Sequence, residues 1–277
     1  MQTILLSAFF AGLVAVIVTM AIEKWGGIVG GVLGTVPTTI IPATIGIYLE
    51  AGPDGLATSM SLVSFGMLLN ALFIATWIYY PSKKPNVSVI EMILVSLTFW
   101  LIVALILTLF IESLILQTSE LIVSLIGLVL LLVLGIWITY KPRSAPKGKK
   151  KVSRSVLITR GIMAALAIGL AVQLSSIGQP LIAGLASVFP AIFLTTMAAL
   201  WISQGPEVPS GAVGPMMLGG ASVAVYSIIA PLTLPEFGIV IGTAICWIIS
   251  VMSISLPAYW WLIIRSSAGQ WVASDKV

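Results

Sequence analysis

The chain has 277 residues, of which 59% are hydrophobic and only 8% are charged, and its mean hydropathy is +1.16. A soluble domain carries about 25% charged residues, so this composition excludes an ordinary water-soluble protein and indicates a membrane protein. The net charge of +4 does not indicate a nucleic-acid partner, because the basic residues cluster in loops beside apolar segments without interleaved aromatic residues.

Apolar segments long enough to span a bilayer recur along the whole chain. A hydrocarbon core of about 30 Å needs about 20 apolar helical residues. The segments that meet this length are 4–22, 27–49, 56–80, 88–111, 119–140, 156–175, 180–203, 209–231 and 236–264. Short connections join most of them, for example at 50–55, 204–208 and 231–235. The fold class we predict is an all-α polytopic membrane protein with about nine transmembrane helices.

The thirteen Lys and Arg residues orient this arrangement. Eight of them lie between Lys141 and Arg160, and an excess of Lys and Arg marks the cytoplasmic side of a membrane. With an odd count of nine crossings, all thirteen face the same side. We therefore expect an integral membrane protein with its N-terminus outside, and with the linker 141–155 and the C-terminus in the cytoplasm. The plasma membrane is the expected location, and an organelle membrane fits as well.

A shift of 153 residues aligns one half of the chain with the other. It matches Pro37 with Pro190, Gly52 with Gly205, Pro53 with Pro206 and Gly66 with Gly219. Repeats that start five crossings apart enter the membrane from opposite sides, as in the inverted repeats of transporters. Chance similarity between two glycine-rich hairpins is the alternative explanation.

The predicted organisation is therefore two inverted-topology four-helix repeats joined by a central helix. Its parts are a first repeat at 1–111, a central linking transmembrane helix at 112–140, a basic cytoplasmic linker at 141–155, a second repeat at 156–264 and a cytoplasmic tail at 265–277.

Prolines interrupt the second span of each predicted repeat. Proline has no backbone N–H, so Pro37 and Pro190 leave the carbonyls of Leu33 and Ala186 without their helical donors. At membrane depth these carbonyls need neighbours, water or a ligand, and hydroxyl side chains gather around both breaks. The predicted substrate-binding residues are Pro37, Thr38, Thr39, Asn70, Pro190, Thr195 and Thr196. The alternatives are a kinked packing helix and, for the amide, a hydrogen bond between helices.

Acidic residues lie at both ends of the predicted path. Glu50 and Asp54 would stand at the outer mouth and Glu207 at the inner mouth, where they would concentrate cations. For Asp54 and Glu207 the alternative role is capping of the helix N-termini that follow them. We place no charged residue at the centre of a span, and we expect Arg160 to extend toward the cytoplasmic surface.

These features predict a small transporter or channel that moves a small solute or cation along the repeat interface. The alternative is a non-transporting membrane scaffold or assembly subunit. We expect no enzyme, because the chain has no histidine and its single cysteine, Cys246, lies in an apolar stretch. We expect no cofactor and no metal. Membrane lipid and a small-molecule or ion substrate are the expected partners, nucleic acid is not, and a homo-oligomer is left open.

Overall fold

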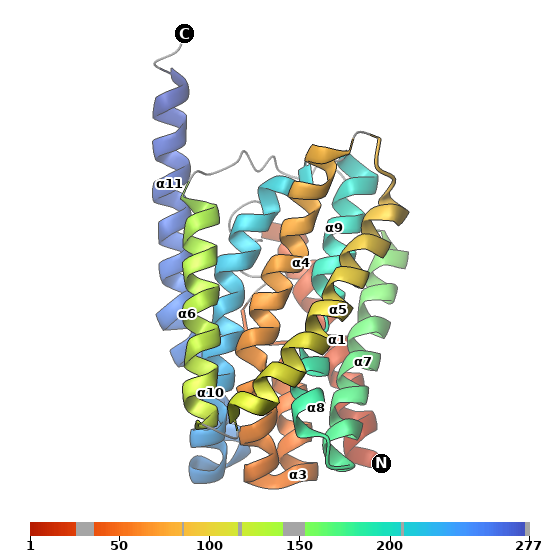
Figure 1. Cartoon of the computed structure of the whole chain (residues 1–277), viewed down its shortest axis with the longest axis vertical. Helices are drawn as coiled ribbons and strands as arrows, with labels where there is room; N and C mark the ends of the chain where they lie inside the picture. The colour runs from red at the N-terminus through yellow and green to blue at the C-terminus, as the bar shows by residue number, and fades with distance from the viewer. Residues whose placement is uncertain (26–35, 85, 116–117, 141–152, 206–207, 275–277) are drawn as a thin grey trace.

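The computed structural model describes residues 1–25, 36–84, 86–115, 118–140, 153–205 and 208–274. Within these ranges the chain forms helices and no strands, as predicted, and most helices follow the long axis of the molecule (Figure 1). In chain order they are α1 (Gln2–Trp25), α3 (Ile41–Ser61), α4 (Val63–Lys83), α5 (Val89–Ile115), α6 (Glu120–Thr139), α7 (Arg154–Ser176), α8 (Pro180–Ser187), α9 (Ala191–Gln204), α10 (Val208–Ser250), the π-helix η1 (Val251–Ser255) and α11 (Leu256–Ser274).

Among the described residues, six helical stretches are long and apolar enough to cross a membrane. They are Ile41–Lys83, Val89–Ile111, Glu120–Thr139, Arg154–Ser176, Pro180–Ile202 and Val213–Arg265. The first and last contain 43 and 53 residues, at least twice the number that one crossing needs. Each contains one glycine at which the backbone leaves the helix, Gly52 with φ 69° and Gly238 with φ 76°. Only glycine adopts such a positive φ without strain, so these two positions suit a reversal of the chain.

The last reversal differs from the sequence prediction. The connection expected at 231–235 is helical, because Pro231 and Pro235 both lie inside α10. The non-helical backbone comes at Gly238, and α10 turns back at the lower end of the molecule before the chain continues to α11 (Figure 1). Proline interrupts one hydrogen bond of a helix, whereas a positive φ redirects the chain. The glycine therefore marks this turn better than the prolines do.

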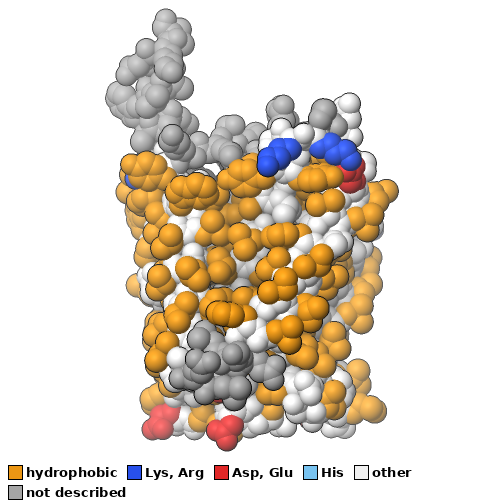
Figure 2. Space-filling model, viewed as in Figure 1, with side chains coloured by type: hydrophobic (Ala, Val, Ile, Leu, Met, Phe, Trp, Pro, Cys, Tyr) orange, Lys and Arg blue, Asp and Glu red, His pale blue; other side chains and the backbone are white. Residues whose placement is uncertain are grey.

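The charged side chains visible in Figure 2 lie near the two ends of the molecule. In the view of Figure 2, Lys and Arg side chains lie at the upper end and acidic side chains lie mostly at the lower end, with a hydrophobic band between them. At one end Lys84 donates a hydrogen bond to Glu91, which raises the pKa of the Lys84 ammonium group. The Tyr80 hydroxyl donates to the same carboxylate over 2.6 Å. The uncharged band between the ends is the surface that a bilayer would cover.

Two helix pairs frame the centre of the molecule. α1 packs against α7, α4 packs against α10, and α6 lies against both α4 and α10. Glycine allows close approach in the first pair, where a Cβ added at Gly12 would lie 2.9 Å from the carbonyl oxygen of Gly161. α3, α8 and α9 pack between these pairs, so the interruptions of these helices fall inside the bundle.

Candidate functional site

Two interruptions of the helices have the same backbone turn, 153 residues apart. At Pro37 and at Pro190 the residue after the proline donates its N–H to the carbonyl of the residue before it, over 2.7 Å in both cases. This is a three-residue turn with proline at its centre, where the fixed φ of proline suits the geometry. We call residues 36–40 the first break and residues 188–190 the second break. α3 starts after the first break, and α9 starts after the second.

The carbonyls of the second break find partners inside the protein. The carbonyl of Ala186, four residues before the proline, accepts a hydrogen bond from the N–H of Phe189 over 3.1 Å. The carbonyl of Val188 accepts one from Nδ2 of Asn70 over 2.8 Å. For the first break, the corresponding carbonyl of Leu33 lies outside the described residues.

Asn70, on α4, connects three parts of the bundle. It is 2% exposed, and its Oδ1 accepts a hydrogen bond from Nε1 of Trp100 on α5 over 2.8 Å. The Trp100 ring in turn meets the Phe189 ring edge-on, with 5.5 Å between the centroids. The amide therefore makes hydrogen bonds between helices, the alternative given above to a role in substrate binding. It also lines the cavity described next.

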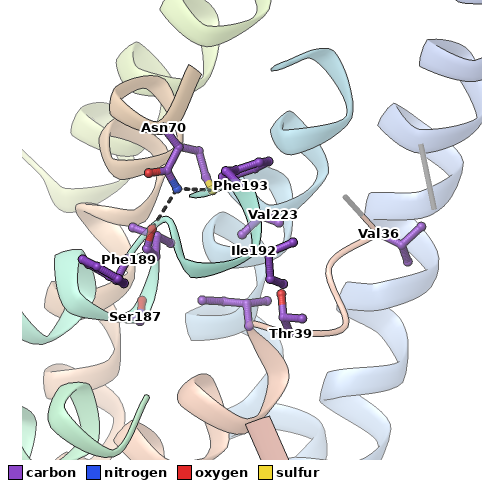
Figure 3. A pocket seen from close by; sticks show the side chains of 11 residues that line it. Val36, Thr39, Asn70, Ser187, Phe189, Ile192, Phe193 and Val223 are labelled. Atoms are coloured by element: carbon purple, nitrogen blue, oxygen red, sulfur yellow. Dashed lines mark hydrogen bonds between the residues drawn. The ribbon is translucent and has the colours of Figure 1, made fainter. Parts of the chain in front are cut away.

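A cavity of about 70 Å³ lies between the two breaks (Figure 3). Its wall consists of Val36, Thr39, Ile40, Met67, Asn70, Ser187, Val188, Phe189, Ile192, Phe193 and Val223. Three of these side chains are polar, and none of the described residues in the wall is charged. The Ser187 hydroxyl donates to the carbonyl of Gly184 over 2.6 Å, within its own helix. The wall is thus mainly apolar, with a few neutral groups that can form hydrogen bonds.

Most of the wall consists of pairs that the shift of 153 residues relates. The pairs are Val36 with Phe189, Thr39 with Ile192, Ile40 with Phe193 and Asn70 with Val223 (189 − 36, 192 − 39, 193 − 40 and 223 − 70 all equal 153). Met67 of the wall and Gly220 have the same separation, and a Cβ added at the glycine would lie 2.8 Å from Cε of the methionine.

A buried arginine holds the helix that follows the second break. Arg160 on α7 is 3% exposed, so the expectation that it extends to the surface is wrong. Its Nε donates to the Thr195 hydroxyl and its Nη2 to the Thr196 hydroxyl, each over 2.8 Å. Two hydroxyls on one turn of α9 let the guanidinium group turn inward. An ionisable group inside a membrane span is a functional signal in itself, and the position of Arg160 within the predicted span 156–175 carries that signal in the sequence.

The structure separates the remaining predicted residues. Thr39 and Asn70 line the cavity, whereas Thr195 and Thr196 contact Arg160 and are not part of its wall. The Thr38 hydroxyl donates to the carbonyl of Val36 over 3.2 Å, within the first break. The roles of these residues in substrate binding stay predictions.

The proposed mouth residues lie apart from the cavity wall. Glu50 is half-buried and Asp54 is exposed, and neither of them lines the cavity. Glu207 lies outside the described residues. Their effect on cations stays a prediction.

The site offers neutral hydrogen-bonding groups rather than metal ligands. Among the described residues, no group of three or more Asp, Glu, Cys or His side chains could hold a metal ion. Comparison with protein-family models, with curated proteins and with solved structures finds no match for this chain.

Proposed function

We propose that the protein is a small membrane transporter or channel whose path runs through the cavity between the two breaks. The observation that carries this proposal is the composition of the wall, four pairs of residues 153 positions apart around two interrupted helices. Transporters with inverted repeats bind their substrates where interrupted helices of the two repeats meet. The position of the cavity between two interrupted helices supports the proposal.

The proposed architecture is two inverted four-helix repeats, 1–111 and 156–264, with α6 between them. Equal backbone turns at Pro37 and Pro190 support it, as do the positive φ values of Gly52 and Gly205, which are 69° and 91°. Reversals at Gly52 and Gly238 would divide the two longest of the six helical stretches into separate crossings, and α1 would bring the proposed count to nine. The first residues of α1 and the last residues of α11 lie at opposite ends of the molecule (Figure 1), which supports an odd count.

The proposed orientation is the one that the basic residues favour. The end of the bundle with Lys84 would face the cytoplasm and the end with Asp54 would face outward. The plasma membrane is the proposed location.

The alternative function, a non-transporting scaffold or assembly subunit, requires sealed contact between the two breaks. A cavity of about 70 Å³ with a polar part in its wall favours passage of a solute over such a contact. An empty space in a purely structural bundle costs stability, because its lining atoms lose dispersion contacts.

Flux through vesicles tests the proposal. The purified full chain is reconstituted into liposomes and screened with small neutral solutes and small cations. We expect flux of at least one of them above that of empty liposomes, and a loss of about tenfold in Val223→Phe, which fills the cavity. Val240→Phe is the matched control, because Val240 is 82% exposed on the outer surface of the bundle. A screen without any flux, or equal flux in the two variants, overturns the proposal.

A further inference from the structure

We infer that the cavity between the breaks binds a small uncharged molecule with one hydrogen-bonding head group and a short apolar body. This inference names the substrate class of the proposed transport path, and in that sense it rests on the proposed function. It is carried by an asymmetry between the two halves of the wall, by the position of the buried charge and by the size of the cavity.

The two repeats contribute chemically different walls. In two of the four related pairs, the first repeat supplies a polar side chain and the second an aliphatic one, Thr39 against Ile192 and Asn70 against Val223. In the other two pairs the second repeat supplies phenylalanine where the first has valine or isoleucine. A ligand in this space meets three neutral hydrogen-bonding groups, two of them from the first repeat, in a wall that is otherwise aliphatic and aromatic. An amphipathic molecule suits such a wall.

The polar groups of the wall have little unused capacity for hydrogen bonds. The Asn70 amide already donates to a backbone carbonyl and accepts from Trp100. The Ser187 hydroxyl donates within its own helix. The Thr39 hydroxyl makes no hydrogen bond to another described residue, and it belongs to the cavity wall. One hydroxyl, able both to donate and to accept, matches one head group rather than a polyhydroxylated molecule.

Charge argues against an ion as the ligand. Among the described residues of the wall none is charged, so an ion would lose its water without gaining a counter-charge. The guanidinium group of Arg160 binds α9 at Thr195, about one helical turn beyond Ile192 of the wall. Because this positive charge is held beside a helix turn next to the wall, it repels a cation in the cavity. An anion would need the guanidinium group in the wall, and it does not lie there.

Size limits the ligand to a few non-hydrogen atoms. The cavity of about 70 Å³ is roughly half the size of an engineered protein cavity that takes benzene. Propionamide has a short apolar body, one uncharged head group and five non-hydrogen atoms. Propionate and propylammonium have the same carbon chain with a negative or a positive head group. These three molecules separate charge from size.

Protection of a cysteine in the cavity wall measures binding without transport. Val223→Cys is introduced into the full chain in which Cys246→Ala removes the natural thiol, and the purified protein is treated with methyl methanethiosulfonate. We expect propionamide to slow the modification at least threefold and the two ions to leave its rate unchanged. Thr39→Val should reduce the protection by propionamide, whereas Thr108→Val should not, because the Thr108 hydroxyl bonds to its own helix on α5. Ile192→Cys serves as a second reporter if the first variant does not fold.

The outcomes separate this inference from the proposed function. Equal or stronger protection by either ion, no protection by propionamide, or no modification of either introduced cysteine overturns the inference. Protection by propionamide without flux in vesicles supports the inference and contradicts transport. Flux of a cation in vesicles, together with protection by propylammonium, supports transport and contradicts the inference.

Discussion

The first and second breaks share a backbone turn but differ in what supports them. Beside the second break, the Asn70 amide binds the carbonyl of Val188, and Arg160 binds two hydroxyls of the helix that follows. In the first break the Thr38 hydroxyl bonds within the break itself. Proline thus determines the common turn, and side chains from distant helices determine how firmly each break is held.

The arginine itself shows the same difference. Its counterpart in the first repeat is Ser7, 153 residues earlier, which is buried and packs against Gly46 of α3. At this pair of positions a serine packs against a glycine in the first half, whereas in the second half a charged group binds two hydroxyls. Two halves with the same backbone turn can in this way differ in polarity.

The largest effect is expected for Gly184→Ala, which tests the close packing beside the second break. A Cβ at this position overlaps the backbone carbonyl of Ser59 on α3, and backbone cannot move aside as a side chain can. We expect a loss of about 3 kcal/mol or more, or no folded protein. Gly169→Ala is the control, because its Cβ would meet only the Cβ of Ala8 at 3.3 Å. The measurement is the unfolding midpoint in mixed micelles with increasing SDS. Equal midpoints would contradict the contact.

The next effect compares the polar and the aliphatic wall of the cavity. Asn70→Leu leaves a carbonyl and the indole N–H of Trp100 without partners, at a cost of roughly 2–3 kcal/mol. Val223→Leu, at the related position, adds one methylene group beside the cavity and leaves no hydrogen-bonding group without a partner, so it should cost less, about 1 kcal/mol. Chemical unfolding of both variants measures the difference. Similar losses would show that the amide contributes packing rather than hydrogen bonds.

A smaller effect is expected where the arginine holds the second half. Thr195→Val removes one hydrogen bond from a buried guanidinium group, which costs about 2 kcal/mol for a charged donor. Thr108→Val, which removes a hydrogen bond within one helix, should cost less than about 1 kcal/mol. The readout is the free energy of unfolding of each variant. If Thr195→Val loses no more stability than Thr108→Val, the hydrogen bonds of Arg160 do not explain the difference between the halves.

The smallest difference between the two halves is expected at the two glycine turns outside the cavity. Gly52 and Gly205 have positive φ values, and a Cβ added at either of them would meet no atom within 4 Å. Their ψ values of −170° and 171° complete a combination that only glycine adopts freely, so replacement by alanine costs backbone strain of about 1–3 kcal/mol at each position. We expect the two thermal unfolding midpoints to fall by the same amount. Clearly unequal shifts would argue that the turns are not related.

Local chemistry explains which features the sequence revealed. Apolar length predicts helices, and the lack of an N–H predicts interruptions at Pro37 and Pro190, because both depend on neighbouring residues only. The prolines at 231 and 235 predict a turn several residues before the observed one at Gly238, because a proline is compatible with a continuing helix whereas this glycine is not in a helical conformation.

The wall of the cavity was harder to predict. Ile192 and Val223 are aliphatic residues in a chain full of them, so nothing in their own chemistry marks them. The shift of 153 residues does mark them, since it maps Thr39 and Asn70 onto these positions. Arg160 was misjudged because its partners lie 35 and 36 residues away in the sequence, and only the packing of α7 against α9 brings them together.

The buried guanidinium group of Arg160 has an electrical consequence. A full crossing of a membrane by one elementary charge is worth about 2.3 kcal/mol per 100 mV. Any rearrangement that moves α7 along the bilayer normal would therefore respond to the transmembrane voltage, in proportion to the fraction of the field that this charge crosses. Ser7, at the matching position on α1, carries no charge and would add nothing to such a response.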